Sequence, residues 1–135
     1  MADATCQSVT IEADADVVRV RQATRELVVA ASLSLVDQTK MVTATSELAR
    51  NTLIYGGGGV ANLEIVDNGQ RTGVRATFID TGPGIPDVDL ALQDGYTSGN
   101  GLGLGLSGAR RLVDEFELDT KVGEGTRVTV TKWRR

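Results

Sequence analysis

The sequence predicts an α+β protein, a two-layer α/β sandwich in which about three helices cover one face of a mixed β-sheet. One observation is the order of patterns along the chain: a strand, two helices, two strands, one helix and two strands. Another is that strands follow one another in pairs, whereas a Rossmann fold alternates single strands with single helices. The length of 135 residues is that of one domain, so residues 1–135 are expected to form one unit.

The N-terminal half predicts one strand and two helices. Residues 8–12 alternate apolar and polar side chains, which is typical of a strand. Asp14 or Asp16 can cap a helix that extends to about residue 31. A second helical pattern covers about 36–53 and ends at a run of four glycines.

The C-terminal half predicts two hairpins separated by a loop-rich stretch and a helix. Residues 60–66 and 73–79 have strand composition and are joined by an Asp-Asn-Gly-Gln turn. Two prolines and two glycines within 80–86 prevent a helix or strand from continuing there. The remaining expected elements are a helix at 109–116 and strands at 118–122 and 127–133.

The composition excludes several functional classes. A net charge of −4 disfavours attraction to nucleic acid or anionic lipid, so neither is an expected partner. One cysteine and no histidine exclude an intrachain disulfide, a cysteine-based zinc site and phosphohistidine chemistry on this chain. No apolar stretch is long enough to cross a bilayer and no signal-peptide pattern is present, so a cytoplasmic location is expected.

Glu47 and Asn51 lie four residues apart on the second predicted helix, so their side chains project from one face about one turn apart. The amide oxygen of Asn51 suits Mg²⁺ as a ligand, and the Glu47 carboxylate can accept a proton from a hydroxyl or a water. Taken alone, the pair is more typical of a solvated helix surface.

Asp80 ends a predicted strand and is followed by Gly82 and Gly84, which allow the backbone to turn sharply. A carboxylate at this position can accept a hydrogen bond from the exocyclic amine of adenine. A capped β-turn accounts for the same fragment, and the fragment alone leaves both interpretations open.

Six glycines occur within 95–108, a density that favours close approach to a ligand and predicts a surface segment. Gly101, Gly103 and Gly105 precede the next predicted helix, where backbone N–H groups and the helix dipole favour phosphate. No strand leads into this segment as a dinucleotide fingerprint requires, and no P-loop pattern is present. The segment therefore predicts phosphate binding of another kind.

Four motifs, taken in order, resemble the N, G1, G2 and G3 boxes of GHKL ATPases, the Bergerat-fold superfamily. They are Glu47-Leu-Ala-Arg-Asn51, Asp80-Thr-Gly-Pro-Gly84, Gly101-Leu-Gly-Leu-Gly105 and Gly123-Glu-Gly-Thr126. The small size and the stretches at 46–51, 94–98 and 111–116 resemble the anti-sigma factor and switch-protein serine kinase branch, most closely the RsbT-type stressosome kinases.

This resemblance implies a role for each motif residue. Asp80 is expected to bind the adenine amine with help from Thr126, and Asn51 is expected to hold Mg²⁺. Glu47 is the expected general base. The glycines expected to contact ATP are Gly82, Gly84, Gly101, Gly103 and Gly105.

One feature departs from related sporulation-type kinases, because residues 95–108 contain no Arg or Lys to face the γ-phosphate. Arg50, Arg110 or Arg111 can supply that charge, or Mg²⁺ and backbone amides can carry it, since phosphoryl transfer depends mainly on positioning and electrostatics. Arg50 is equally explained as a surface ion-pair residue.

The function that the resemblance implies is a serine/threonine-protein kinase using ATP and Mg²⁺. Its expected substrates are STAS-domain scaffold proteins in a partner-switching stress pathway, and its expected second partner is a PP2C-type phosphatase that it activates by binding. The alternative is a nucleotide-gated binding regulator, like an anti-sigma factor, with little or no catalysis.

Overall fold

The computed structural model describes residues 5–92 and 104–135. These residues form one five-stranded sheet with the spatial order β1-β2-β3-β5-β4. The strands are β1 (Cys6–Ile11), β2 (Gly59–Asp67), β3 (Thr72–Asp80), β4 (Glu115–Lys121) and β5 (Gly125–Trp133). The helices are α1 (Asp14–Ala30), α2 (Leu35–Ile54), α3 (Val88–Ala91) and α4 (Leu104–Leu112).

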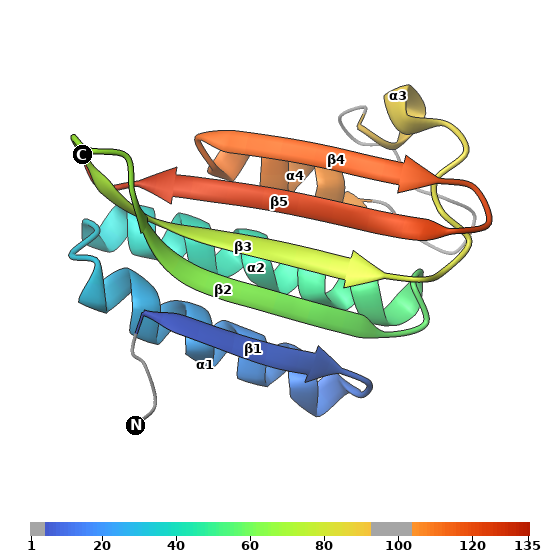
Figure 1. The fold of residues 1–135 in the computed structure, drawn as a ribbon, viewed down its shortest axis with the longest axis horizontal. Coiled ribbons are helices and arrows are strands. Elements are labelled where there is room, and N and C mark those ends of the chain that lie inside the picture. The colour runs from blue at the N-terminus through green and yellow to red at the C-terminus, as the bar shows by residue number, and fades with distance from the viewer. Residues whose placement is uncertain (1–4, 93–103) are drawn as a thin grey trace.

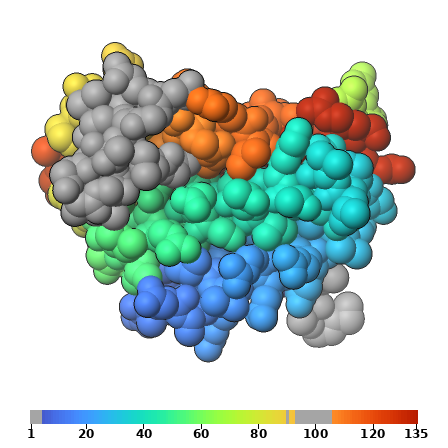
Figure 2. All heavy atoms as spheres, turned by 180° about the vertical axis from the view of Figure 1, so that it is seen from behind, coloured from blue at the N-terminus to red at the C-terminus, as the bar shows by residue number. Residues whose placement is uncertain are grey.

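The expected two-layer α+β architecture is confirmed. The three longer helices, α1, α2 and α4, lie on one face of the sheet (Figure 1). Seen from behind, α2 runs between α1 and α4 and contacts both (Figure 2). The central helix α2 therefore packs between its two neighbours and against the sheet. None of the helices in the described ranges has the length and apolar character needed to cross a membrane.

The expectation of a mixed sheet is wrong, because all four strand pairings are antiparallel. A single crossover helix between β1 and β2 would make these neighbours parallel. Here two antiparallel helices, α1 and α2, connect them, and the second helix returns the chain to the end of the sheet where β1 stops. At the other side, β5 folds back as a hairpin between β3 and β4.

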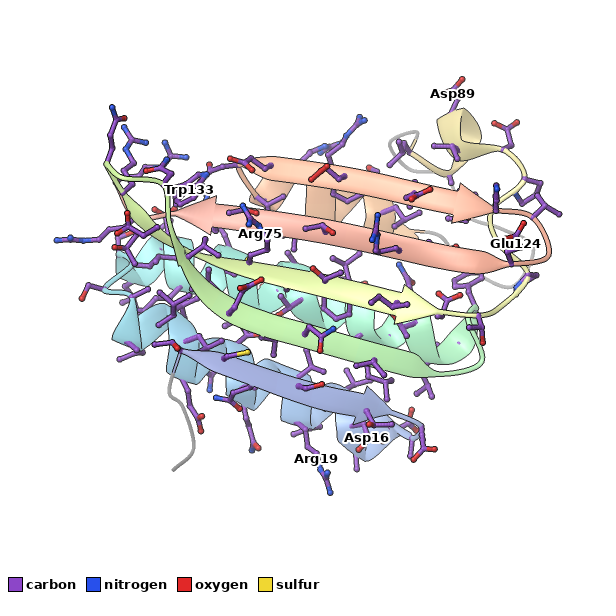
Figure 3. All side chains as sticks on the ribbon, viewed as in Figure 1. Asp16, Arg19, Arg75, Asp89, Glu124 and Trp133 are labelled. Carbon is purple, nitrogen blue, oxygen red and sulfur yellow. The ribbon has the colours of Figure 1, made fainter. Side chains whose placement is uncertain are left out.

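The core lies between the sheet and the helices. Along β3, Val74, Ala76 and Phe78 face the helices and are buried. Arg75 points to the opposite face of the sheet, where Trp133 also lies (Figure 3). The hydroxyl groups of the buried Thr24 and Thr45 lie 2.9 Å apart across the α1–α2 contact, and each also has a backbone carbonyl of its own helix within donating distance.

The helix expected at 109–116 begins and ends earlier, at Leu104 and Leu112, and β4 already starts at Glu115. Glycines lower helix propensity, but burial of Leu106 and Ala109 against the core favours the helix. The expectation that residues 95–108 stay out of the core is therefore wrong at Leu106 and Ser107, which are both buried. The short helix α3 was not expected either, since it follows the proline-containing loop.

Candidate functional site

A cavity of about 280 Å³ opens at the end of the sheet where β3 ends and β5 begins. Its walls come from the C-terminal half of α2, the loop after β3, α3, α4 and the first residues of β5. The interior is mostly apolar and includes Leu48, Phe78, Leu106 and Val128. A small number of polar groups on an apolar wall is the usual composition of a site that binds a small organic molecule.

Asp80 is one of these polar groups and occupies the last position of β3, half-buried at the cavity. The backbone N–H of Gly82 donates to Asp80 Oδ1 at 2.9 Å, which fixes the orientation of the carboxylate. Asp80 also pairs in register with Thr126 on β5, so both side chains belong to one end of the cavity. The sequence prediction that these two residues act together is consistent with this placement.

The hydroxyl of Thr126 lies 2.8 Å from that of Thr120, on the neighbouring strand. Thr120 Oγ1 can donate to the carbonyl of Gly125 and accepts from the backbone N–H of Ile85. Thr120 has a single proton, which it can give to the carbonyl of Gly125 or to Thr126, so either threonine can be the donor in the hydroxyl pair. In either case Thr126 keeps at least one acceptor lone pair for a donor group in the cavity, such as an amine.

Asn51 lines the cavity from α2, and its buried Nδ2 atom has no hydrogen-bond partner in the described part of the chain. A buried amide without a partner is costly, and the O and N atoms of such a group can be exchanged by a flip. In one orientation the amide requires an acceptor such as a phosphate oxygen, and in the other it presents an oxygen to a cation. Either orientation fits a phosphate chain with its metal ion.

No group of three or more His, Cys, Asp or Glu side chains that could hold a metal is found among the described residues. Mg²⁺ sites beside substrate phosphates commonly keep several waters and take few protein ligands. The Asn51 amide oxygen is one group on the cavity wall that fits such an ion.

The other predicted site residues lie at different distances from the cavity. Glu47 is half-buried on α2 one turn before Asn51, and it lies outside the cavity wall. Arg50 is exposed and does not line the cavity. Of the predicted glycines, Gly84 lines the cavity, Gly82 binds Asp80, Gly105 lies in the first turn of α4, and Gly101 and Gly103 fall outside the described residues.

Sequence reasoning missed three residues that shape this site, Tyr55, Gly56 and Thr120. Tyr55 and Gly56 line the cavity just after α2, and Thr120 anchors both Thr126 and the loop after β3. Tyr55 lies four residues after Asn51, so the same helical spacing that paired Asn51 with Glu47 could have identified it. Nothing in the local sequence reveals the contact between Thr120 and residue 85.

The chain matches the family model described as Histidine kinase-, DNA gyrase B-, and HSP90-like ATPase over residues 36–135. It is 41% identical over 135 residues to the serine/threonine-protein kinase RsbT of Bacillus subtilis (strain 168), and the match covers 100% of both chains. It is also 32% identical over 97 residues to an anti-sigma F factor of Clostridium beijerinckii, covering 67% of this chain and 66% of that protein.

Two solved structures show the same fold at low identity. The RsbU and RsbW domains of Rv1364c from Mycobacterium tuberculosis align with a TM-score of 0.66 and 23% identity, covering 96% of this chain and 33% of that longer chain. The mycobacterial sensor histidine kinase MprB aligns with a TM-score of 0.58 and 17% identity, covering 96% and 97%. The chain therefore belongs to the histidine kinase-, DNA gyrase B- and HSP90-like ATPase family, in the branch that contains its RsbT and anti-sigma F relatives.

Proposed function

We propose that this chain is a serine/threonine-protein kinase that transfers the γ-phosphate of ATP to a hydroxyl on a STAS-domain protein. ATP binding follows from membership of the ATPase family, and a kinase relative matches over the full length. The observation that carries the proposal is the cavity itself, which combines Asp80 and Thr126 at one end with the unpartnered amide of Asn51.

At the base end of the cavity, Asp80 and Thr126 recognise adenine. The carboxylate, held by the N–H of Gly82, accepts a hydrogen bond from the exocyclic amine. The hydroxyl oxygen of Thr126, which lines the same end of the cavity, accepts from the same amine or from a water that bridges to it. The apolar wall around Phe78 and Leu106 stacks against the base and excludes water.

At the phosphate end, Asn51 would hold Mg²⁺ through its amide oxygen, and a bound ion would supply positive charge against the phosphate chain. The N-terminus of α4 adds favourable dipole interactions with the phosphates. We assign the remaining phosphate contacts to the backbone of Gly101, Gly103 and Gly105, as the resemblance to the family implies.

Glu47 is the proposed general base, one turn from Asn51 on the same helix face. The oxygen of the partner's serine or threonine attacks the γ-phosphorus, and the bond from this phosphorus to the β–γ bridging oxygen breaks. ADP leaves with that oxygen, and the hydroxyl proton goes to Glu47. Glu47 is half-buried on α2 and is not part of the cavity wall, which is compatible with a hydroxyl that comes from another protein.

In cells, the phosphorylated STAS protein is proposed to release the kinase, which then activates a PP2C-type phosphatase by binding it. The similarity to the RsbT kinase and to anti-sigma F factors supports a regulator that exchanges protein partners in the cytoplasm.

A second candidate function is nucleotide-gated partner binding with little or no catalysis. It is favoured by the exposed position of Arg50, which leaves no arginine side chain on the described wall of the cavity to stabilise the transition state. In this case Glu47→Ala retains ATP-dependent partner binding, whereas Asp80→Asn loses it because adenine recognition is removed.

The experiment that tests the proposal is calorimetric titration of MgATP into the wild type and Asp80→Asn, followed by incubation with labelled ATP and a STAS-domain protein. The kinase proposal expects binding that Asp80→Asn abolishes, and label on the STAS protein that Glu47→Ala abolishes. Full transfer by Glu47→Ala rejects the assigned base. Binding without transfer supports the nucleotide-gated regulator, and absence of binding rejects both functions.

A further inference from the structure

Gly56 lies directly against the side chain of Asp80, just beyond the C-terminal end of α2. A Cβ atom at position 56 would lie 2.5 Å from Asp80 Cγ and 2.6 Å from both Cβ and Oδ2. Such distances are well inside ordinary van der Waals contact, so no side chain fits between the two residues. The absence of a side chain at 56 is what leaves room for the carboxylate in its present position.

This restriction is steric and does not come from the backbone conformation. Gly57 and Gly58 have φ angles of 73° and 106°, which favour glycine on conformational grounds. Gly56 is not among the positive-φ residues, so alanine can adopt its backbone conformation without strain. The obstacle to alanine at this position is the Asp80 side chain.

The carboxylate of Asp80 is constrained from two sides. Gly82 N–H holds Oδ1, while Gly56 lies against Oδ2. Gly82 in turn packs on the backbone of Gly56, because a Cβ at 82 would lie 2.8 Å from Gly56 Cα and from its carbonyl oxygen. The two glycines and the carboxylate therefore form one close-packed unit.

The same unit is connected to the phosphate end of the cavity. The N–H of Gly56 donates to the carbonyl of Asn51 at 3.3 Å, and that carbonyl also accepts from Tyr55 at 2.9 Å. Gly56 thus links the last turn of α2, which carries Asn51, to the end of β3, which carries Asp80.

We infer that Gly56 is a positioning residue for Asp80 and thereby determines the preference of the cavity for a base with an exocyclic amine. The inference rests on the proposed function, since it takes the cavity to bind a nucleotide. A methyl group at 56 turns the carboxylate away from the amine and leaves the phosphate contacts in place. Gly56→Ala is therefore expected to lower the selectivity of the cavity for adenine, and the loss of affinity should differ between nucleotides with different bases.

The test compares ATP with inosine triphosphate, which has the same ribose and phosphates but a carbonyl oxygen in place of the amine. The wild type binds ATP more tightly by about tenfold or more, because the inosine oxygen faces a carboxylate. Gly56→Ala lowers ATP affinity and brings the ratio of the two dissociation constants close to one. Retention of the wild-type ratio in Gly56→Ala overturns the inference, whether the two affinities stay the same or fall by the same factor.

Gly73→Ala is the matched control, because it makes the same substitution at the other end of β3. A Cβ there would lie 2.6 Å from the carbonyl of Lys132 and 2.7 Å from the ring of Trp133, again without a positive φ. It lowers the melting temperature through a comparable clash, but the ratio of affinities stays at the wild-type value. If Gly56→Ala affected only the stability of the fold, it would likewise lower the melting temperature and leave the ratio of affinities unchanged.

A double-mutant cycle in thermal stability tests the contact without any nucleotide. Asp80→Gly removes the three atoms that would lie nearest to a methyl group at 56, which are Cβ, Cγ and Oδ2 of Asp80. Gly56→Ala is expected to lower the melting temperature strongly in the wild type and little in the Asp80→Gly background, which also rescues folding if the single variant is insoluble. Equal losses in both backgrounds overturn the inference. If the wild type binds no nucleotide, the proposed function fails, and this cycle still decides whether Gly56 holds the carboxylate.

Discussion

At the scale of single residues, the needs of folding and of function conflict at Asn51. Its buried Nδ2 has no partner in the part of the chain that the structure describes, which costs stability in the free protein. Natural proteins keep such groups where a ligand later satisfies them. The orphaned amide is therefore a property of the site and does not indicate poor packing.

Replacing this residue separates the two requirements. Asn51→Leu is expected to raise the free energy of unfolding of the nucleotide-free protein by about 1 kcal/mol, since it removes an unpaired polar group. The same variant should lose phosphotransfer and the dependence of ATP affinity on Mg²⁺. Urea unfolding and titrations with and without EDTA measure both effects. A less stable variant that keeps its response to Mg²⁺ would contradict the assignment.

Thr120 acts on the site through Thr126 and through the loop after β3. Thr120→Val leaves the N–H of Ile85 unpaired and frees the hydroxyl of Thr126 to rotate. We expect a loss of about 1–2 kcal/mol in the free energy of unfolding and about tenfold weaker ATP binding. Thr129→Val, on the open face of β5, is the control and should leave ATP affinity unchanged. If Thr129→Val weakened ATP binding as much as Thr120→Val does, the assigned role of Thr120 in positioning the site would be wrong.

At the scale of elements, α2 carries the site at one end and a buried ionic cluster at the other. Asp37, in its first turn, lies 3.5 Å from Lys132 Nζ and 3.8 Å from Arg135 Nε. Lys132 also lies 3.5 Å from Asp114, and both Lys132 and Asp37 are buried. This ionic cluster joins the start of α2 to the end of β5 and to the segment after α4.

Breaking the cluster is expected to destabilise the fold without altering the site. Asp37→Ala should lower the free energy of unfolding by about 3 kcal/mol, because a buried cation loses one of its two partners. Asp119→Ala removes one member of an exposed pair with Arg127 and should cost less than about 1 kcal/mol. Chemical denaturation measures both, and ATP affinity at 25 °C should be unchanged. If both variants lost the same free energy of unfolding, burial of the ionic cluster would add nothing to the stability of the fold.

The elements that the sequence predicted best are those with long periodic patterns. Helices α1 and α2 were found nearly to their ends, because a wide apolar stripe repeats through several turns. The start of α4 was missed because glycine-rich composition argued against helix, while burial of Leu106 decided the outcome. The hairpins β2–β3 and β4–β5 were expected. The antiparallel direction of the β1–β2 pairing was missed, because it depends on how α1 and α2 return the chain.

The candidate site was predictable only in part. Asp80, Asn51 and Thr126 were found from motif order, and the structure places all three on one cavity. Gly56 and Thr120 act through contacts between segments distant in sequence, which no local pattern records.

At the scale of the whole molecule, the cavity joins segments from both halves of the chain, so ligand binding should stabilise the entire fold. A nucleotide at about 100 times its dissociation constant contributes about 2.7 kcal/mol. For a domain of this size, the melting temperature is expected to rise by about 8–10 °C with MgATP. Differential scanning fluorimetry measures the shift, and Asp80→Asn should show almost none. An equal shift in that variant would place the nucleotide elsewhere.

The location of the only tryptophan has a practical consequence for spectroscopy. Trp133 packs over Gly73 and donates its ring N–H to Glu115 at 2.7 Å, on the sheet face opposite the helices. It lies seven residues along β5 from Thr126, which is roughly 23 Å in an extended strand. Its intrinsic fluorescence should therefore report unfolding, or a protein docked on that face, while remaining silent when nucleotide enters the cavity.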